Sequence, residues 1–403
     1  MTSSLGDLAT PLRTLDPTDS DLSDLEPLRA LIGAARVAAI GESAHCVHEF
    51  YELKHRVLRF LVSELGFTAF VMESGFAEGL VVNDWVLGGD GDIERIANVG
   101  ITYGFGDCPE MRAQLQWMRD WNATHERKVR FYGMDLPGSA ASPRAAVEAC
   151  LSRLDRRPED VELLALSNLG DRFGAPARHA AMTSDERERL SSGLAGLVER
   201  AREMGQEIAY RCARSAQRVD EYLTGLRLHG GAHPGTRGVR EEHMAENIRW
   251  ILDREERIIV GAHNVHVQKG SFLGAPMLGK LLATMLDEAL VTIGTTYASG
   301  QIIQKRNQTS PPAEWIVSLD ELQAPPPHSV DALMSAVGLP LHVVDLRRLP
   351  VERIGGATTM LVHHSLIPIV PKEAFDALIH VEHVTPAPGL FETLHADIAR
   401  IRA

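Results

Sequence analysis

The stretch Val37-Ala38-Ala39-Ile40-Gly41-Glu42-Ser43-Ala44-His45 decides the fold class of this 403-residue chain. Its first four residues form a short apolar run, which is typical of a strand buried in a parallel sheet. From residue 47 to residue 65 apolar side chains recur at helical spacing, so a helix should follow the strand. Glu42 and His45 are therefore expected at a strand-to-helix turn, on the carboxyl edge of the sheet, where open α/β folds bind ligands.

Strand-like runs alternate with helical patterns along most of the chain, which predicts an α/β fold with a largely parallel sheet flanked by helices. The expected strands are 37–41, 68–73, 129–134, 257–261 and 290–295, with further candidates at 341–344, 358–362 and 377–381. The alternation stops between residues 139 and 239. We expect the first half of the α/β core at 1–138, an inserted helical hairpin covering the active-site cleft at 139–239, and the second half of the core at 240–403.

Helix signals mark the insertion. Ser142-Pro143 is typical of an N-cap followed by a proline in the first turn. Thr183 and Glu186 have the spacing of a capping box, which predicts a long helix running toward Leu226. A glycine-rich loop at Gly230–Gly238 is expected to end the insertion, and Arg240 to open the next helix.

Composition excludes several classes of protein. The chain has 41 basic and 54 acidic residues and a net charge of −13, which disfavours nucleic acid and anionic membranes as partners. The four cysteines lack CxxC spacing, and no apolar run reaches the roughly 20 residues of a membrane span. The first 21 residues lack the pattern of a signal peptide. We therefore expect a cytoplasmic protein, with its oligomeric state open.

Four of the expected strands end in ionisable residues. Glu42 follows the first of them, Glu73 ends the second, Asp135 follows the third and His263 follows the strand at 257–261. Parallel strands bring their carboxyl ends to one edge of a sheet, so these groups should converge. Burying several charges costs several kcal/mol unless they pair or take part in chemistry. The pattern thus predicts a functional site.

The residue types at this edge favour general base catalysis. The G-x-S-x-G motif of common serine hydrolases is absent from the sequence. An imidazole held by Glu42 or Glu73 can act as a base on water, and a second histidine can polarise a carbonyl. Arg240 is expected to close the cleft and contact Glu42 or Glu73. Tyr103 and Phe105, like Trp85 and Trp117, fit either a substrate pocket or the core.

A metal site is an alternative at the same edge. His-x-x-His spacing occurs at His45/His48, His263/His266 and His380/His383, and the nearby carboxylates would complete a ligand set for zinc. None of these pairs belongs to an H-E-x-x-H or H-x-x-E-H motif, and the chain has 17 histidines in all. We predict no metal and no other cofactor.

These residues occur in stretches that resemble the erythromycin esterase family across nearly the whole chain. The stretches are 41–45 with Glu49-Phe50, Met72-Glu73-Ser74-Gly75, Gly133-Met134-Asp135-Leu136-Pro137, Arg240-Glu241 with 244–247, 262–269 and Phe375-Asp376-Ala377-Leu378-Ile379.

The resemblance implies a hydrolase in which His45 activates water against a macrolide lactone carbonyl without a metal. It also implies site positions for Glu42, Glu73, His263 and His266, and a long helical hairpin over the cleft. Lys54 stands where macrolide-opening members carry arginine, and Glu241 where aspartate is usual.

Taken together, the sequence predicts a carboxylic ester hydrolase whose small-molecule substrate is an ester or lactone within a large polyketide-like molecule. We expect His45, Glu42, Glu73 and His263 to be catalytic, and Lys54, Asp135, Arg240 and His266 to bind substrate. Two alternatives stay open. One is a biosynthetic tailoring enzyme that uses the same base for elimination, cyclisation or acyl transfer, and the other is a metal- or haem-binding protein without enzymatic activity.

Overall fold

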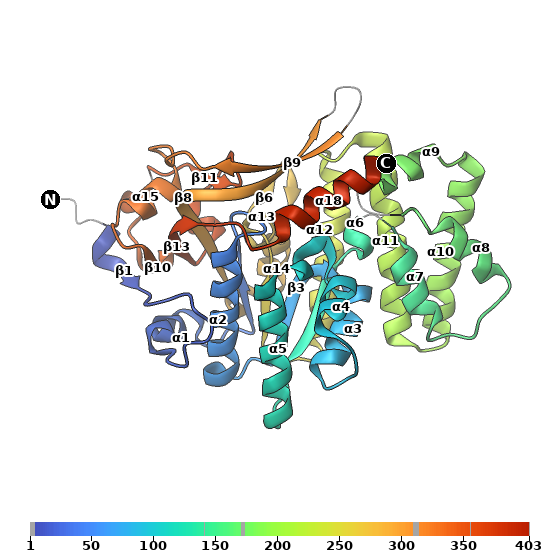
Figure 1. Cartoon of the computed structure of the whole chain (residues 1–403), viewed down its shortest axis with the longest axis horizontal. Coiled ribbons are helices and arrows are strands. Elements are labelled where there is room, and N and C mark those ends of the chain that lie inside the picture. Colours follow the sequence, from blue (N-terminus) through green and yellow to red (C-terminus); the bar gives the residue numbers. More distant parts are fainter. Residues whose placement is uncertain (1–4, 141, 171–173, 309–313, 355, 403) are drawn as a thin grey trace.

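The computed structural model describes residues 5–140, 142–170, 174–308, 314–354 and 356–402 (Figure 1). Nine strands form a mixed sheet with the order β1-β10-β13-β8-β2-β5-β3-β4, and β9 pairs with an extension of β8. The six strands from β13 to β4 run parallel, whereas β1, β10 and β9 pair antiparallel with their neighbours. The predicted α/β class with a largely parallel sheet is confirmed.

The strands are β1 (Ala9–Pro11), β2 (Val37–Ile40), β3 (Ala69–Gly75), β4 (Arg130–Asp135), β5 (Ile258–Gly261), β6 (Ser271–Phe272), β7 (Ala275–Pro276), β8 (Leu290–Gln308), β9 (Glu314–Glu321), β10 (Leu341–Asp345), β11 (Thr359–Val362), β12 (Ser365–Pro368) and β13 (Ala377–Val384). The helices are α1 (Glu26–Ile32), α2 (His48–Leu65), α3 (Phe76–Val86), α4 (Ile93–Gly100), α5 (Pro109–Thr124), α6 (Pro137–Ala140), α7 (Arg144–Leu151), α8 (Glu159–Leu166), α9 (Ala175–Ala181), α10 (Ser184–Glu203), α11 (Glu207–His229), α12 (Pro234–Leu252), α13 (Asn264–Val267), α14 (Leu278–Leu286), α15 (Val330–Ser335), α16 (Val351–Ile354), α17 (Pro371–Ala374) and α18 (Leu390–Arg402).

Strand β2 lies in the middle of the sheet, and all four of its side chains are buried. Because successive side chains point to opposite faces, Val37 and Ala39 pack in the hydrophobic layer that contains α12 and α14. Ala38 and Ile40 pack in the opposite layer, with α1, α2 and α5. The continuous apolar run is therefore explained by helices covering both faces.

Each of the eight expected strands is present, and most differ from the expectation by one or two residues at their ends. The strand expected at 358–362 is β11, which pairs with β12 in a separate two-stranded sheet. None of the helices in the described ranges combines the length and the apolar character that a bilayer crossing requires.

Helices, and no strands, fill the described part of 139–239. The capping box is confirmed, because Thr183 Oγ1 accepts a hydrogen bond from Glu186 N at 3.2 Å and Glu186 Oε2 accepts one from Thr183 N at 2.8 Å. The single helix expected from Thr183 toward Leu226 is wrong. The chain turns at residues 204–206, where Gly205 has a φ of 64°, and this turn separates α10 from α11.

Two further boundaries differ from the expectation. The loop expected at Gly230–Gly238 is wrong from Pro234 onward, because α12 begins there with proline in its first turn, and Arg240 lies inside it. The ring of His233 caps this helix by accepting from Gly235 N at 3.2 Å. Helix α7 begins at Arg144, one residue later than Ser142-Pro143 suggests.

The helices of the insertion stand beside the β4 edge of the core (Figure 1). Helix α11 packs against α7, α10 and α12, and it also contacts α3 and α6. This arrangement places the helical segment next to the elements that follow β4. Its role as a cover of the cleft, and the division of the chain at residues 138 and 239, stay predictions.

Candidate active site

Four adjacent strands end in ionisable residues at the same edge of the sheet. In sheet order, β2, β5, β3 and β4 lead to Glu42, His263, Glu73 and Asp135. All four side chains are at most 5% exposed. A charged group this deeply buried costs several kcal/mol unless it is paired, so the partners of these four side chains determine what the site can do.

The turn after β2 is held tightly against β5 and β8. A Cβ atom on Gly41 would lie 2.1 Å from Asn264 Oδ1, so this position excludes larger residues. Asn264 in turn donates to the carbonyl of Thr295 at 2.8 Å and accepts from the amide of Thr295 at 3.1 Å. Cys46 completes the turn with a φ of 63°. These contacts fix the backbone that carries Glu42 and His45.

Glu42 connects the imidazole of His45 with the ammonium of Lys54 on α2. His45 Nδ1 lies 2.6 Å from Glu42 Oε1, and Lys54 Nζ donates to Glu42 Oε2. Burial raises the pKa of Glu42, but Lys54 and His45 outweigh burial, so the pKa lies below its usual value. An ionised Glu42 accepts the Nδ1 proton of His45 and leaves Nε2 as a proton acceptor. Of the two glutamates expected to orient His45, the structure places Glu42 against it.

Arg240 on α12 binds two of the buried carboxylates. Its Nε and Nη2 donate to Asp135 at 2.9 and 2.5 Å, and Nη2 also donates to Glu73 Oε1 at 2.7 Å. Glu73 Oε2 accepts a hydrogen bond from the backbone N–H of His263 at 2.8 Å. Arg240 therefore fixes Glu73, and Glu73 fixes the turn that carries His263.

His266 lies between two glutamates. Its Nε2 is 3.2 Å from Glu73 Oε1, and its Nδ1 is 2.8 Å from Glu241 Oε1. Burial lowers the pKa of His266, but Glu241 and Glu73 outweigh burial and raise it to about 10. His266 is thus an imidazolium at neutral pH, and it compensates the charge of Glu73. Glu241, which stands where aspartate is usual in the family, contacts the site through this histidine.

His263 is a neutral imidazole beside His45, with ring centroids 4.7 Å apart. Its Nδ1 accepts from Val265 N at 3.2 Å, so the ring proton is on Nε2. Burial, and then the electrostatic interaction with the neighbouring ring of His45, hold the pKa of His263 well below its usual value. The buried Nε2 has no hydrogen-bond partner among the described residues. This N–H can therefore donate to an oxygen that enters the site.

Three further side chains adjoin the two histidines. The ring of Phe105 lies 5.1 Å from that of His45, and Tyr103 OH donates to Asp135 Oδ2 at 2.8 Å. The ring of His363, in the turn between β11 and β12, lies 5.4 Å from His45 and 5.3 Å from His263. Tyr103 and Phe105 were among the aromatic residues expected either in a pocket or in the core, and the structure places them at the site.

Sequence reasoning missed His363. It directly follows the apolar strand β11, as His263 follows β5 after one residue, and this was the available signal. Strand β11 belongs to a separate two-stranded sheet. The order of strands in the main sheet therefore does not predict where His363 lies. Trp85 and Trp117, by contrast, pack in the hydrophobic layer of α2 and α5.

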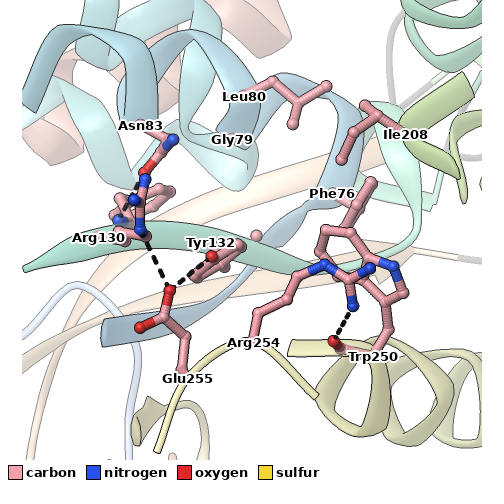
Figure 2. A pocket seen from close by; sticks show the side chains of 12 residues that line it. Phe76, Gly79, Leu80, Asn83, Arg130, Tyr132, Ile208, Trp250, Arg254 and Glu255 are labelled. Carbon is pink, nitrogen blue, oxygen red and sulfur yellow. Dashed lines mark hydrogen bonds and ion pairs between the residues drawn. The ribbon is translucent and has the colours of Figure 1, made fainter. Parts of the chain in front are cut away.

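A separate cavity of about 360 Å³ lies along β4, between α3 and the end of α12 (Figure 2). Its polar groups are paired with one another. Glu255 accepts from Tyr132 OH at 2.8 Å and lies 3.3 Å from Arg130 Nε, and Arg254 donates to the carbonyl of Trp250 at 2.7 Å. None of the predicted site residues lines this cavity, so the carboxyl edge of the sheet is the candidate active site.

Comparisons with known proteins place the chain in a family. The chain is 28% identical to the erythromycin esterase type II of Escherichia coli over 94% of its own length and 96% of that protein. It is 22% identical to the putative hydrolase YbfO of Bacillus subtilis, covering 93% and 89% of the two chains.

Two solved structures share the fold. A succinoglycan biosynthesis protein has a TM-score of 0.79 at 22% identity and covers 95% of this chain and 96% of its own. A histidine-to-asparagine mutant of the erythromycin esterase EreC in its open conformation has a TM-score of 0.76 at 22% identity, with 95% and 99% covered. The sequence profile described as erythromycin esterase matches residues 62–384. The chain therefore belongs to the erythromycin esterase family.

Proposed function

We propose that the protein is a metal-independent hydrolase in which His45 activates water for attack on an ester or macrolactone carbonyl. The observation that carries this proposal is the pairing of His45 Nδ1 with the ionised Glu42, at 2.6 Å, beside a neutral His263. Hydrolysis of an ester requires two groups. One is a base whose tautomer is fixed by a partner, and the other is a hydrogen-bond donor beside that base.

The reaction would begin when His45 Nε2 takes a proton from a water molecule as its oxygen attacks the carbonyl carbon. Glu42 stabilises the resulting imidazolium, as the carboxylate does in a catalytic triad. The Nε2–H of His263 donates to the carbonyl oxygen as negative charge develops on it, a contribution of about 10²–10³ in rate for one donor. His45 then returns the proton to the leaving alkoxide, which yields an acid and an alcohol.

The remaining predicted residues support these two histidines. Lys54 holds Glu42, and Arg240 with His266 holds Glu73, which accepts from the backbone of His263. These ion pairs favour a positioning role over the substrate contacts expected for Lys54, Asp135, Arg240 and His266.

The substrate we propose is an ester or lactone within a large polyketide-like molecule. The names of two Escherichia coli relatives, erythromycin esterases of types I and II, support this class. All four cysteines are buried and none forms a disulfide with another described residue, which is common in a reducing compartment and supports a cytoplasmic location. Such a hydrolase would give a cell resistance to an antibiotic of this class.

A panel of macrolides and simpler lactones incubated with the enzyme in oxygen-18 water tests the proposal. Hydrolysis predicts a product heavier by one water, with the label in the new carboxylate. A converted product without the label would favour the tailoring enzyme that uses the same base for elimination, cyclisation or acyl transfer. The absence of conversion across the panel would contradict the substrate class.

A further inference from the structure

We infer that His45, His263 and His363 bind one divalent transition-metal ion of the Zn²⁺ class, and that the bound ion inhibits hydrolysis. One ring nitrogen from each histidine lies within 4.8 Å of those of the other two. The three rings come from the turn after β2, the turn after β5 and the β11–β12 hairpin. Binding is inferred from this geometry, whereas the inhibition rests on the proposed function.

The nitrogens of this cluster are free to act as ligands. His263 Nε2 and His363 Nδ1 are buried without a hydrogen-bond partner in the described part of the chain. His45 uses Nδ1 to contact Glu42, which leaves Nε2 for an ion. A carboxylate on the distal nitrogen is the usual support of a metal-bound histidine, because it fixes the ring and raises its basicity.

Binding requires only a small rearrangement of the rings. Zinc–nitrogen bonds of about 2.0–2.1 Å place two ligands of a tetrahedral ion about 3.4 Å apart. The widest nitrogen–nitrogen separation must therefore contract by at most about 1.4 Å, which side-chain rotation can supply. The backbone of His363 is already fixed, since its N–H donates to the carbonyl of Ser43 at 2.8 Å and its carbonyl accepts from Tyr297 OH.

His263 must also change its tautomer. Its proton has to move from Nε2 to Nδ1, and the hydrogen bond from Val265 N is then lost. One hydrogen bond is a small loss beside coordination by three imidazoles. The ion then occupies both groups that the hydrolysis uses, the accepting nitrogen of His45 and the donating nitrogen of His263, and displaces the attacking water.

The full chain, stripped of metals with a chelator that is then removed, is titrated with Zn²⁺ by calorimetry and with Co²⁺ by visible absorption. Hydrolysis is measured in the same samples. We expect one ion per chain and loss of hydrolysis at stoichiometric Zn²⁺. The variant His363→Asn should bind the ion at least about 100-fold more weakly, since loss of an outer-shell partner alone costs about 10–100-fold.

The matched control is His364→Asn, because this adjacent histidine lies 3.4 Å from Asp320 and is not part of the cluster. It should bind Zn²⁺ as the unmodified chain does, and His45→Asn should weaken binding as His363→Asn does. Equal affinity in His363→Asn and the control, or no binding by the unmodified chain, would overturn the inference and leave the proposed hydrolase intact. Hydrolysis that appears only when Zn²⁺ is added would overturn the inhibition together with the metal-independent mechanism.

Discussion

Replacing Glu42 with glutamine should destabilise the protein mainly through Lys54. Lys54 is 5% exposed, and its ammonium pairs with the Glu42 carboxylate. Glutamine has nearly the same shape but carries no charge, so the variant leaves a buried cation without its counter-ion. Removal of one partner from a buried ion pair costs about 3–5 kcal/mol. We expect the free energy of unfolding, measured by urea denaturation at pH 7, to fall by that amount.

The double variant Glu42→Gln/Lys54→Met removes both charges. Its free energy of unfolding should return to within about 1–2 kcal/mol of the unmodified protein, because apolar replacement of a buried pair is often close to neutral. Hydrolysis should not return with stability. Without the carboxylate the imidazolium of His45 is unsupported, and the corresponding change in a Ser-His-Asp triad lowers kcat about 10⁴-fold.

These two readouts separate the structural role of Glu42 from its chemical role. Unmodified stability in Glu42→Gln would refute the buried ion pair. Full kcat in the stabilised double variant would refute the assignment of Glu42 as the partner of the base.

Three other changes test the supporting network. The pKa of His266 is raised from 6.5 to about 10, which corresponds to about 5 kcal/mol of stability at 1.36 kcal/mol per unit. This stability is complete below about pH 6.5 and is lost as the pH rises through 10. In urea denaturation from pH 6 to 10, the His266→Gln variant should therefore lose less stability than the unmodified protein, and an equal loss would contradict this pKa. Arg240→Met leaves Asp135 without its cation and Glu73 with His266 alone, and it should lower the free energy of unfolding by about 3–5 kcal/mol. The exposed Arg249→Met should change it by less than about 0.5 kcal/mol. Tyr103→Phe removes one hydrogen bond to Asp135 and should cost about 1.5–3 kcal/mol in the same assay, and no loss would argue against that bond.

The convergence of the candidate site residues could be predicted because it depends on strand order and direction alone. Short apolar runs that each end in an acid or a histidine place Glu42, Glu73, Asp135 and His263 at one edge once the sheet is parallel. The side-chain pairing could not be predicted in the same way. Whether Glu42 or Glu73 contacts His45 depends on two interactions between distant residues. Lys54 on α2 binds Glu42, and Glu73 Oε2 accepts a hydrogen bond from the backbone N–H of His263 at 2.8 Å.

The misplaced features have local causes. A turn of three residues at 204–206 interrupts a helical pattern that is otherwise continuous, and proline at residue 234 starts α12 within a glycine-rich stretch. His363 reaches the site through a hairpin outside the main sheet, and its φ of 51° is rare for a residue other than glycine. The periodicity of apolar residues, from which helices and strands are predicted, does not reveal such a contact between a hairpin and the site.

Replacement of the base tests the account most directly. His45→Asn is compared with His48→Asn, whose ring lies one turn later and pairs with Glu52 and Glu110. With the substrate found in the labelled-water panel, kcat of His45→Asn should fall by about 10²–10⁴ while its circular dichroism spectrum stays unchanged, and His48→Asn should keep its rate. A folded His45→Asn variant that hydrolyses the substrate at an undiminished rate would contradict the account.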